Sequence, residues 1–88
     1  MKYFDWNVIK NEKLRSERNI CFEDIVIAID EGKIIDIVAN KNFPKQKIFI
    51  IEVNDYAYLV PFIEDEKKIF LKTIIPSRKA TKKYLINN

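Results

Sequence analysis

The chain has 88 residues, of which 48% are hydrophobic and 33% are charged, with a formal net charge of +3, one cysteine and no histidine. A chain of this length and composition forms a single folded domain with one core, which we place at residues 1–88, and not a disordered tail. The missing histidines exclude histidine bases and histidine metal ligands, and a lone Cys21 excludes an internal disulfide. We therefore expect neither a metal nor another cofactor, and we expect Cys21 to be a small core or helix-cap residue.

The hydrophobic residues are spread through the chain in short runs. No run approaches the roughly 20 apolar residues that a membrane-spanning helix needs. The opening residues Met1–Asp5 also lack the pattern of a secretory signal. We therefore expect a cytoplasmic protein that does not associate with a membrane.

The first elements in chain order are a short strand and a helix. Lys2–Asp5 favours a strand because its aromatic residues suit a pleated surface. Asn7 is a good N-cap for a helix that reaches about Arg18, and Asn19 is a suitable stop because asparagine tolerates positive φ. This helix is charge-rich and only weakly amphipathic.

A second helix follows, and its apolar face is the clearest in the chain. Four apolar residues recur at the spacing of one helix face: Phe22, Ile25, Val26 and Ile29. Gly32 stands where such a helix would end. The stripe predicts a core-facing helix.

The rest of the chain predicts four strands and a last helix. The strands are expected at Ile34–Val38, Ile48–Val53, Tyr56–Glu64 and Lys68–Ile75. Asn54-Asp55 suits a two-residue hairpin turn, so the second and third of these strands should be antiparallel neighbours. Pro61 predicts an edge position or a bulge, because proline cannot donate to the ladder. The last of these strands should alternate, with Ile75 on one face and Ile74 on the other.

A final short helix is expected at about Arg78–Ile86, after Pro76 breaks the strand and with Ser77 as its cap. Glu64-Asp65-Glu66 and Asn40–Lys45 have the composition of a turn and a polar loop. The order of elements predicts an α+β fold: a short N-terminal strand, two helices, a four-stranded antiparallel meander and a C-terminal helix. We expect the helices to pack on one face of the sheet.

Positive charge is concentrated near the C-terminus. From Lys67 to Lys83 the chain has seven basic residues and no acidic residue. A positive cluster at a strand–helix junction is what the phosphate backbone of a nucleic acid requires. The same pattern is also typical of a solvated helix face, so both interpretations stay open.

Two segments at opposite ends of the chain resemble the BrnT family, the toxins of bacterial type II toxin–antitoxin systems. The first reads Phe4-Asp5-Trp6-Asn7, then Lys10, then Arg18-Asn19-Ile20-Cys21-Phe22-Glu23 in the same register as the family. The second segment is Ile74-Ile75-Pro76-Ser77-Arg78-Lys79-Ala80-Thr81. It resembles the strand and the Ala-Arg-Lys-Ala-Thr motif near the C-terminal end of the family's sequences. From the first to the last position of each match, the two segments together span roughly a third of the chain.

The chain departs from the BrnT pattern at four places. Arg18 and Asn19 replace a His and a Gly, Leu14 replaces a common Asn, and Lys82-Lys83 stand in place of a Glu-Arg pair. Any step that uses the family's histidine is therefore not carried over to this chain.

The resemblance implies a RelE-like fold and a metal-independent endoribonuclease that cleaves RNA and inhibits translation. It also implies a cognate antitoxin, usually a ribbon-helix-helix protein. The toxin would reach operator DNA only through this antitoxin. Such an enzyme uses the ribose 2′-OH as its nucleophile, and it needs a base, an acid and positive charge on the phosphate.

Candidate residues for these roles follow from their chemistry. Arg78 is the first choice for the phosphate because its planar fork holds two oxygens, and Lys79 and Lys72 come next. For the base or acid the sequence offers Glu64, a desolvated Lys72, or a tyrosine. Further candidates for contact with RNA are Lys82, Lys83, Tyr58, Tyr84, Arg18 and Lys10.

The alternatives are a basic module that binds an antitoxin or RNA without cutting it, and a structural protein whose BrnT-like ends only determine the fold. The absence of an evident base favours the first alternative, and the Arg78-Lys79 junction favours the enzyme. Arg18 and Lys10 are equally suited to ion pairs on a helix surface, and Tyr58 and Tyr84 are equally suited to packing.

Overall fold

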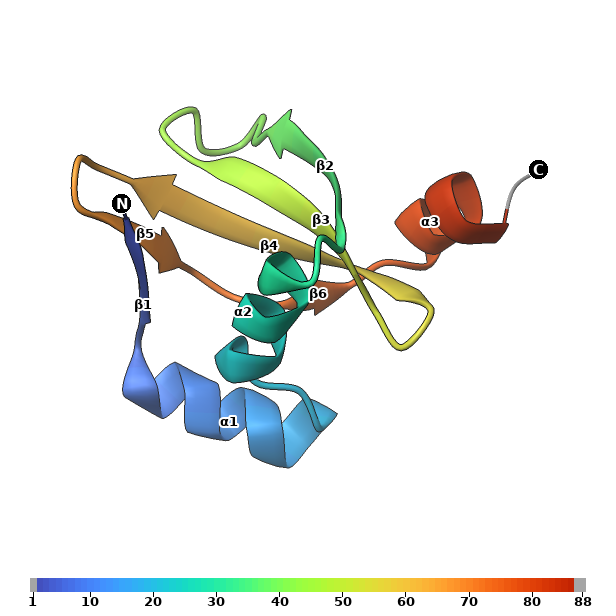
Figure 1. Cartoon of the computed structure of the whole chain (residues 1–88), viewed down its shortest axis with the longest axis horizontal. Helices are drawn as coiled ribbons and strands as arrows, with labels where there is room; N and C mark the ends of the chain where they lie inside the picture. The colour runs from blue at the N-terminus through green and yellow to red at the C-terminus, as the bar shows by residue number, and fades with distance from the viewer. Residues whose placement is uncertain (1, 87–88) are drawn as a thin grey trace.

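A computed structural model describes residues 2–86 as an α+β domain built on one mixed sheet (Figure 1). The sheet order is β1-β5-β4-β3-β2, and the short β6 pairs with β4. In chain order the elements are β1 (Tyr3–Trp6), α1 (Val8–Arg18), α2 (Phe22–Asp30), β2 (Ile34–Ala39), β3 (Lys47–Val53), β4 (Tyr56–Glu64), β5 (Lys68–Leu71), β6 (Ile75–Pro76), α3 (Arg78–Thr81) and the π-helical turn η1 (Lys82–Ile86). The predicted element types and the antiparallel meander β2-β3-β4-β5 are confirmed.

The ends of the first two helices follow the local chemistry of their sequences. The Asn7 side chain accepts a hydrogen bond from the Lys10 backbone N–H at 2.9 Å and caps α1. Asn19 ends the same helix with φ of 55°, and Gly32 follows α2 with φ of 77°. Cys21 is buried at the N-cap of α2, as predicted for a small core or cap residue.

The β3–β4 hairpin turns at the predicted dipeptide. Asn54 and Asp55 have φ of 52° and 64°, and positive φ at both central residues is the geometry of a type I′ turn. The turn sets the register in which Val53 faces Tyr56. β3 lies inside the sheet with Phe49, Ile50 and Ile51 all buried, which agrees with the prediction from its almost continuous apolar run.

The predicted last strand is interrupted, which corrects the sequence interpretation. β5 ends at Leu71, and pairing with β4 resumes only at β6. The Lys72 N–H donates to the Pro61 carbonyl at 2.8 Å, and the Pro61 nitrogen, on the same side of β4, has no hydrogen to offer in return. The chain bulges here, so Pro61 lies at a bulge inside the sheet and not at its edge.

The bulge also shifts the alternation of side chains. Ile74 is fully buried in the main core together with Leu71, whereas Ile75 is 41% exposed on the opposite face together with Lys72. The strict alternation predicted from the sequence, with Ile75 on one face and Ile74 on the other, places Leu71 with Ile75 and Lys72 with Ile74. That assignment is wrong because a bulge reverses the faces of every residue that follows it.

Helices cover both faces of the sheet, and the prediction that they share one face is wrong. α1 and α2 cover the face that holds the main core (Figure 1). The C-terminal helical segment covers part of the other face, where Ala80 packs with Ile50 and Ala57. The physical reason is that β3 presents apolar side chains to both faces, so Ile50 also needs a cover.

Candidate nucleic-acid interface

The start of the C-terminal helix is fixed by four hydrogen bonds, two of which join it to the central strand β4. The Ser77 N–H donates to the Ala57 carbonyl at 3.0 Å, and the Ser77 hydroxyl accepts from the Ala80 N–H at 3.0 Å. The Thr81 hydroxyl accepts from the Ala57 N–H at 2.8 Å and donates to the Ser77 carbonyl at 2.8 Å. Ser77, Ala80 and Thr81 of the BrnT-like segment are therefore structural.

The two basic side chains within that segment take no part in these hydrogen bonds. Arg78 and Lys79 are exposed, as are Lys82 and Lys83 in the following turn. The ion pairs formed within residues 2–86 involve none of these four cations. Their positive charge is therefore not compensated by a carboxylate of the described chain, and it is available to an anionic partner.

A groove of about 600 Å³ opens on the same face of the sheet as the C-terminal helix. Ile48, Leu59 and Pro61 of β3 and β4 contribute to its lining. The β2–β3 loop contributes Asn40, Asn42, Phe43 and Gln46, and the chain after β5 contributes Lys72, Thr73 and Ile75. The structure thereby places the exposed Lys72 on the wall of this groove.

The groove and the basic helix are neighbours. Leu59 lines the groove and also packs against the small cluster that contains Ala80 of α3. Ile75, another lining residue, is separated from Ser77 by only Pro76. Lys72 and the helix that carries Arg78 therefore lie on one face of the sheet. The backbone N–H of Lys72 bonds to Pro61 and that of Ser77 bonds to Ala57, so the two are attached roughly 14 Å apart along β4, at about 3.4 Å per residue.

Tyr58 and Tyr84 do not join this groove. Tyr58 lies on the other face, where it packs against the main core and lines a hollow beside α2. Tyr84 packs against the cluster under the C-terminal helix, and its hydroxyl donates to the Asp36 carboxylate at 2.9 Å. Tyr84 thus ties the helix to β2, with Lys83 Nζ 5.1 Å from its ring centroid.

Glu64 lies away from the basic residues of this face. Its carboxylate pairs with Lys2 Nζ at 2.6 Å, and the hydrogen bond from Lys2 lowers the pKa of Glu64 from its ordinary value of 4.5. Along β4 it is three residues beyond the groove residue Pro61, or roughly 10 Å at about 3.4 Å per residue. Glu64 is paired with Ile69, and Ile69 packs against the main core on the helix-covered face.

Arg18 and Lys10 both belong to α1, on the side of the sheet opposite the groove. Arg18 Nη1 donates to the Ile74 carbonyl at 2.8 Å, so Arg18 braces the bulged segment before β6. Lys10 donates its backbone N–H to the Asn7 cap. The structure therefore does not bring these two residues together with Arg78.

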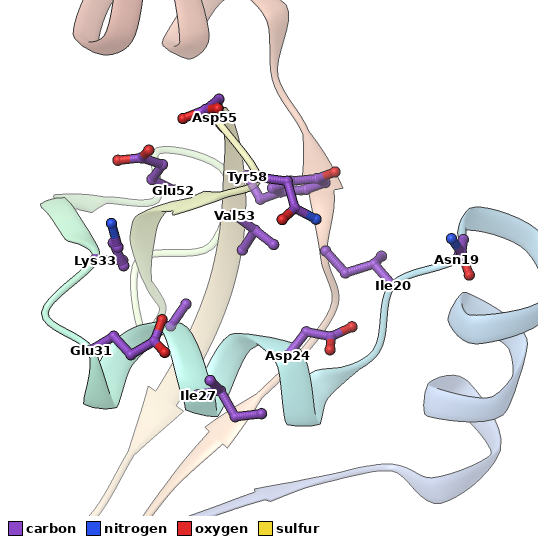
Figure 2. A pocket seen from close by; sticks show the side chains of 12 residues that line it. Asn19, Ile20, Asp24, Ile27, Glu31, Lys33, Glu52, Val53, Asp55 and Tyr58 are labelled. Carbon is purple, nitrogen blue, oxygen red and sulfur yellow. The ribbon is translucent and has the colours of Figure 1, made fainter.

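A second hollow of about 640 Å³ separates α2 from the β3–β4 hairpin (Figure 2). Four carboxylates line it, from Asp24, Glu31, Glu52 and Asp55, and Lys33 is the single cation among its lining residues. Its charge has the wrong sign for a phosphate backbone. Sequence reasoning missed it because these acidic residues are dispersed from position 24 to position 55 and meet only in the fold.

Sequence reasoning also missed the loop that walls the groove. Asn40–Lys45 was predicted only as a polar loop, and it is one. Phe43 is the exception within it, with 58% of its surface exposed. A large aromatic residue inside an otherwise polar loop was the one available signal that this loop lines a groove.

Comparisons with protein-family models, with curated proteins and with solved structures found no match to this chain. The resemblance of the two end segments to BrnT toxins thus stays a prediction from sequence. Within residues 2–86 no helix is long and apolar enough to cross a membrane. The same residues bring together no group of three or more cysteine or acidic side chains able to hold a metal ion.

Proposed function

We propose that the protein is the toxin of a bacterial type II toxin–antitoxin system, a cytoplasmic, metal-independent endoribonuclease of RelE-like fold that inhibits translation. One observation carries the proposal: an uncompensated cluster of cations on a braced helix adjoins a groove that holds Lys72 on the same sheet face. Such an arrangement offers an RNA strand both a positive track and a rigid support.

The proposed reaction is attack of a ribose 2′ oxygen on the adjacent phosphorus. The new 2′ O–P bond forms as the bond to the 5′ oxygen breaks, which yields a 2′,3′-cyclic phosphate and a 5′-hydroxyl. A base takes the 2′ proton, and an acid returns a proton to the leaving oxygen. Arg78 and Lys79 supply positive charge to the non-bridging oxygens, where negative charge grows in the transition state.

The residues that handle the protons come from the groove side of the sheet in this proposal. Lys72 is the candidate, because it is the one acid–base side chain among the lining residues of the groove. We do not place Glu64 in the mechanism, because it is paired with Lys2 and lies on the face of the sheet opposite the groove.

A cognate antitoxin, proposed to be of the ribbon-helix-helix type, would inhibit the toxin by covering the exposed cations. An acidic segment of that partner matches the charge of Lys79, Lys82 and Lys83. In this proposal the toxin reaches operator DNA only through the antitoxin.

A second function is favoured by one specific observation. The only predicted carboxylate base, Glu64, stands apart from Arg78, so the cationic face has a phosphate-binding character without an evident carboxylate base. A basic module that binds RNA or an antitoxin without cutting is therefore the alternative.

Induced expression in a bacterial host tests both functions. The wild type should arrest growth and produce RNA fragments that end in 2′,3′-cyclic phosphates, and Arg78→Ala should lose both effects. The variant Arg78→Lys keeps the positive charge but lacks the planar guanidinium. The matched control is Lys13→Ala, which changes an exposed lysine on α1. Arrest without cleaved RNA supports the binding module, and no arrest by the wild type overturns the toxin proposal.

A further inference from the structure

The groove on the open face of the sheet combines three chemistries that a nucleobase uses. Its lining contains one aromatic ring, three side-chain amides and one cation, and none of its lining residues is acidic. We propose that it binds an unstacked base of single-stranded RNA against Phe43, with a neighbouring phosphate at Lys72. This inference rests on the proposed function and names the base-binding part of the same site.

Phe43 is held by the loop in an exposed position. Its N–H donates to the Asn40 carbonyl at 3.3 Å, and its carbonyl accepts from the Gln46 N–H at 2.9 Å. The Asn40 side chain accepts a further bond from the Asn42 N–H at 3.1 Å. An aromatic ring that is 58% exposed on a loop with internal hydrogen bonds is a preformed stacking surface.

The amides beside Phe43 suit the edge of a base. Asn40 Nδ2 donates to Gln46 Oε1 at 3.3 Å, which orients the Gln46 amide and leaves its nitrogen free to donate. Asn42 and Gln46 both line the groove with Phe43. Side-chain amides form paired hydrogen bonds with base edges, so this wall can hold a base that lies on the apolar floor.

The far wall of the groove supplies the charge. Lys72 is exposed there, with its Nζ 5.4 Å from the ring centroid of Phe70. The groove volume of about 600 Å³ falls within the range of about 300–1,000 Å³ that small-molecule sites occupy, which accommodates one nucleotide. The hollow beside α2 has a similar volume but four carboxylates, so it would repel the same ligand (Figure 2).

The groove leads on to the helix that carries the other cations. Leu59 is shared by the groove and by the cluster beneath α3, so a strand seated in the groove would continue beside Arg78. A duplex does not fit this arrangement, because its bases are stacked and paired inside the helix. The occupant is therefore a single strand with at least one base turned out.

Fluorescence anisotropy with two probes tests the inference: a short labelled single-stranded RNA and an abasic ribose–phosphate oligomer of the same length. Phe43→Ala should weaken binding of the RNA by about 5- to 150-fold and leave binding of the abasic oligomer unchanged. Phe43→Trp should keep the wild-type affinity. Tyr3→Ala removes an aromatic ring of nearly equal exposure, 57%, from β1 and should change neither affinity.

The outcomes separate this inference from the proposed function. If the wild type binds both probes equally, or if Phe43→Ala weakens both equally, the base-binding groove is wrong while the basic RNA-binding surface stands. If the wild type binds neither probe, the proposed function and this inference both fail. If Phe43→Ala loses affinity only for the base-containing RNA, the result supports base binding in the groove.

Discussion

Thr81 on the C-terminal helix and Ala57 on the central strand are joined by a buried hydrogen bond of 2.8 Å, in which the Ala57 N–H donates to the Thr81 hydroxyl. Thr81 is 4% exposed and Ala57 is fully buried. The Ala57 carbonyl is bonded to the Ser77 N–H, so both polar groups of one strand residue hold the same helix start. The position of Arg78 and Lys79 therefore depends on this contact.

Replacing Thr81 should release that helix start. We expect Thr81→Val to lower the free energy of unfolding by about 1–3 kcal/mol, because the buried Ala57 N–H loses its acceptor. The variant Thr81→Ser keeps the hydroxyl and should lower the free energy of unfolding by a smaller amount. Urea denaturation followed by circular dichroism measures the difference, and equal stabilities for the two variants would contradict the role of the hydroxyl.

Arg18 should affect stability and not RNA affinity. Its guanidinium donates to the Ile74 carbonyl at 2.8 Å, so Arg18→Ala should destabilise the fold by about 1–2 kcal/mol. The same variant, measured at a temperature where it is fully folded, should bind single-stranded RNA with wild-type affinity. A large loss of RNA affinity with unchanged stability would instead place Arg18 in the interface.

The contact between α1 and α2 should produce part of the acid sensitivity. Asn11, which is 3% exposed, donates to the Glu23 carboxylate at 2.8 Å and accepts from the Phe22 N–H at 2.7 Å. The bond from Asn11 lowers the pKa of Glu23 below its ordinary value of 4.5. The ionised carboxylate therefore stabilises the fold fully above about pH 4.5, and this stabilisation is lost as the pH falls through the folded pKa.

We expect Glu23→Gln to be less stable than the wild type at neutral pH, by at most about 1 kcal/mol because the side chain is half exposed. Its free energy of unfolding should fall less steeply below pH 4.5. Chemical denaturation at a series of pH values measures both effects. Parallel pH profiles for the two proteins would show that Glu23 makes no such contribution.

The salt dependence of RNA binding should identify the cations that meet phosphates. For single strands, the slope of log affinity against log salt changes by about 0.7 for each phosphate contact, so replacing both Lys82 and Lys83 by Gln should make it shallower by about 1.4. The matched control replaces Lys10 and Lys13, on the helix across the sheet. Equal changes of the slope in both double variants would indicate that these lysines act only through the net charge of the protein.

Glu64 should be dispensable for activity. Its carboxylate pairs with Lys2 at the far end of β4, so Glu64→Gln should leave growth arrest and RNA cleavage unchanged. Lys72→Ala, in the groove, should reduce cleavage by about 10²-fold or more if it handles a proton. Loss of cleavage in Glu64→Gln with an intact fold would return the base to this residue.

Local sequence chemistry was enough to predict most element ends. Asn7, Asn19 and Ser77 cap helices as expected, and Asn54-Asp55 forms the predicted turn. Each of these depends on the φ preference or the hydrogen-bonding group of one or two residues, which is present in the chain before any tertiary contact forms. The basic character of the C-terminal segment was equally evident.

The arrangement of the candidate site could not be predicted in the same way. The bulge at Lys72–Ile74 arises because Pro61, on a different strand, lacks an N–H. That bulge decides that Lys72 and Ile75 share the groove, and it left the predicted alternation of Ile74 and Ile75 wrong. The placement of Glu64 on the face opposite the groove likewise follows from strand pairing.

The sequence by itself determined where helices and turns begin and end, and that positive charge gathers after Lys67. Only the tertiary structure decided that the C-terminal helix crosses to the open face, that Phe43 and Lys72 wall one groove, and that Tyr58 lies on the other side. The reason is that caps and turns depend on neighbouring residues, whereas faces depend on which distant strands pair and which apolar surfaces still need burial.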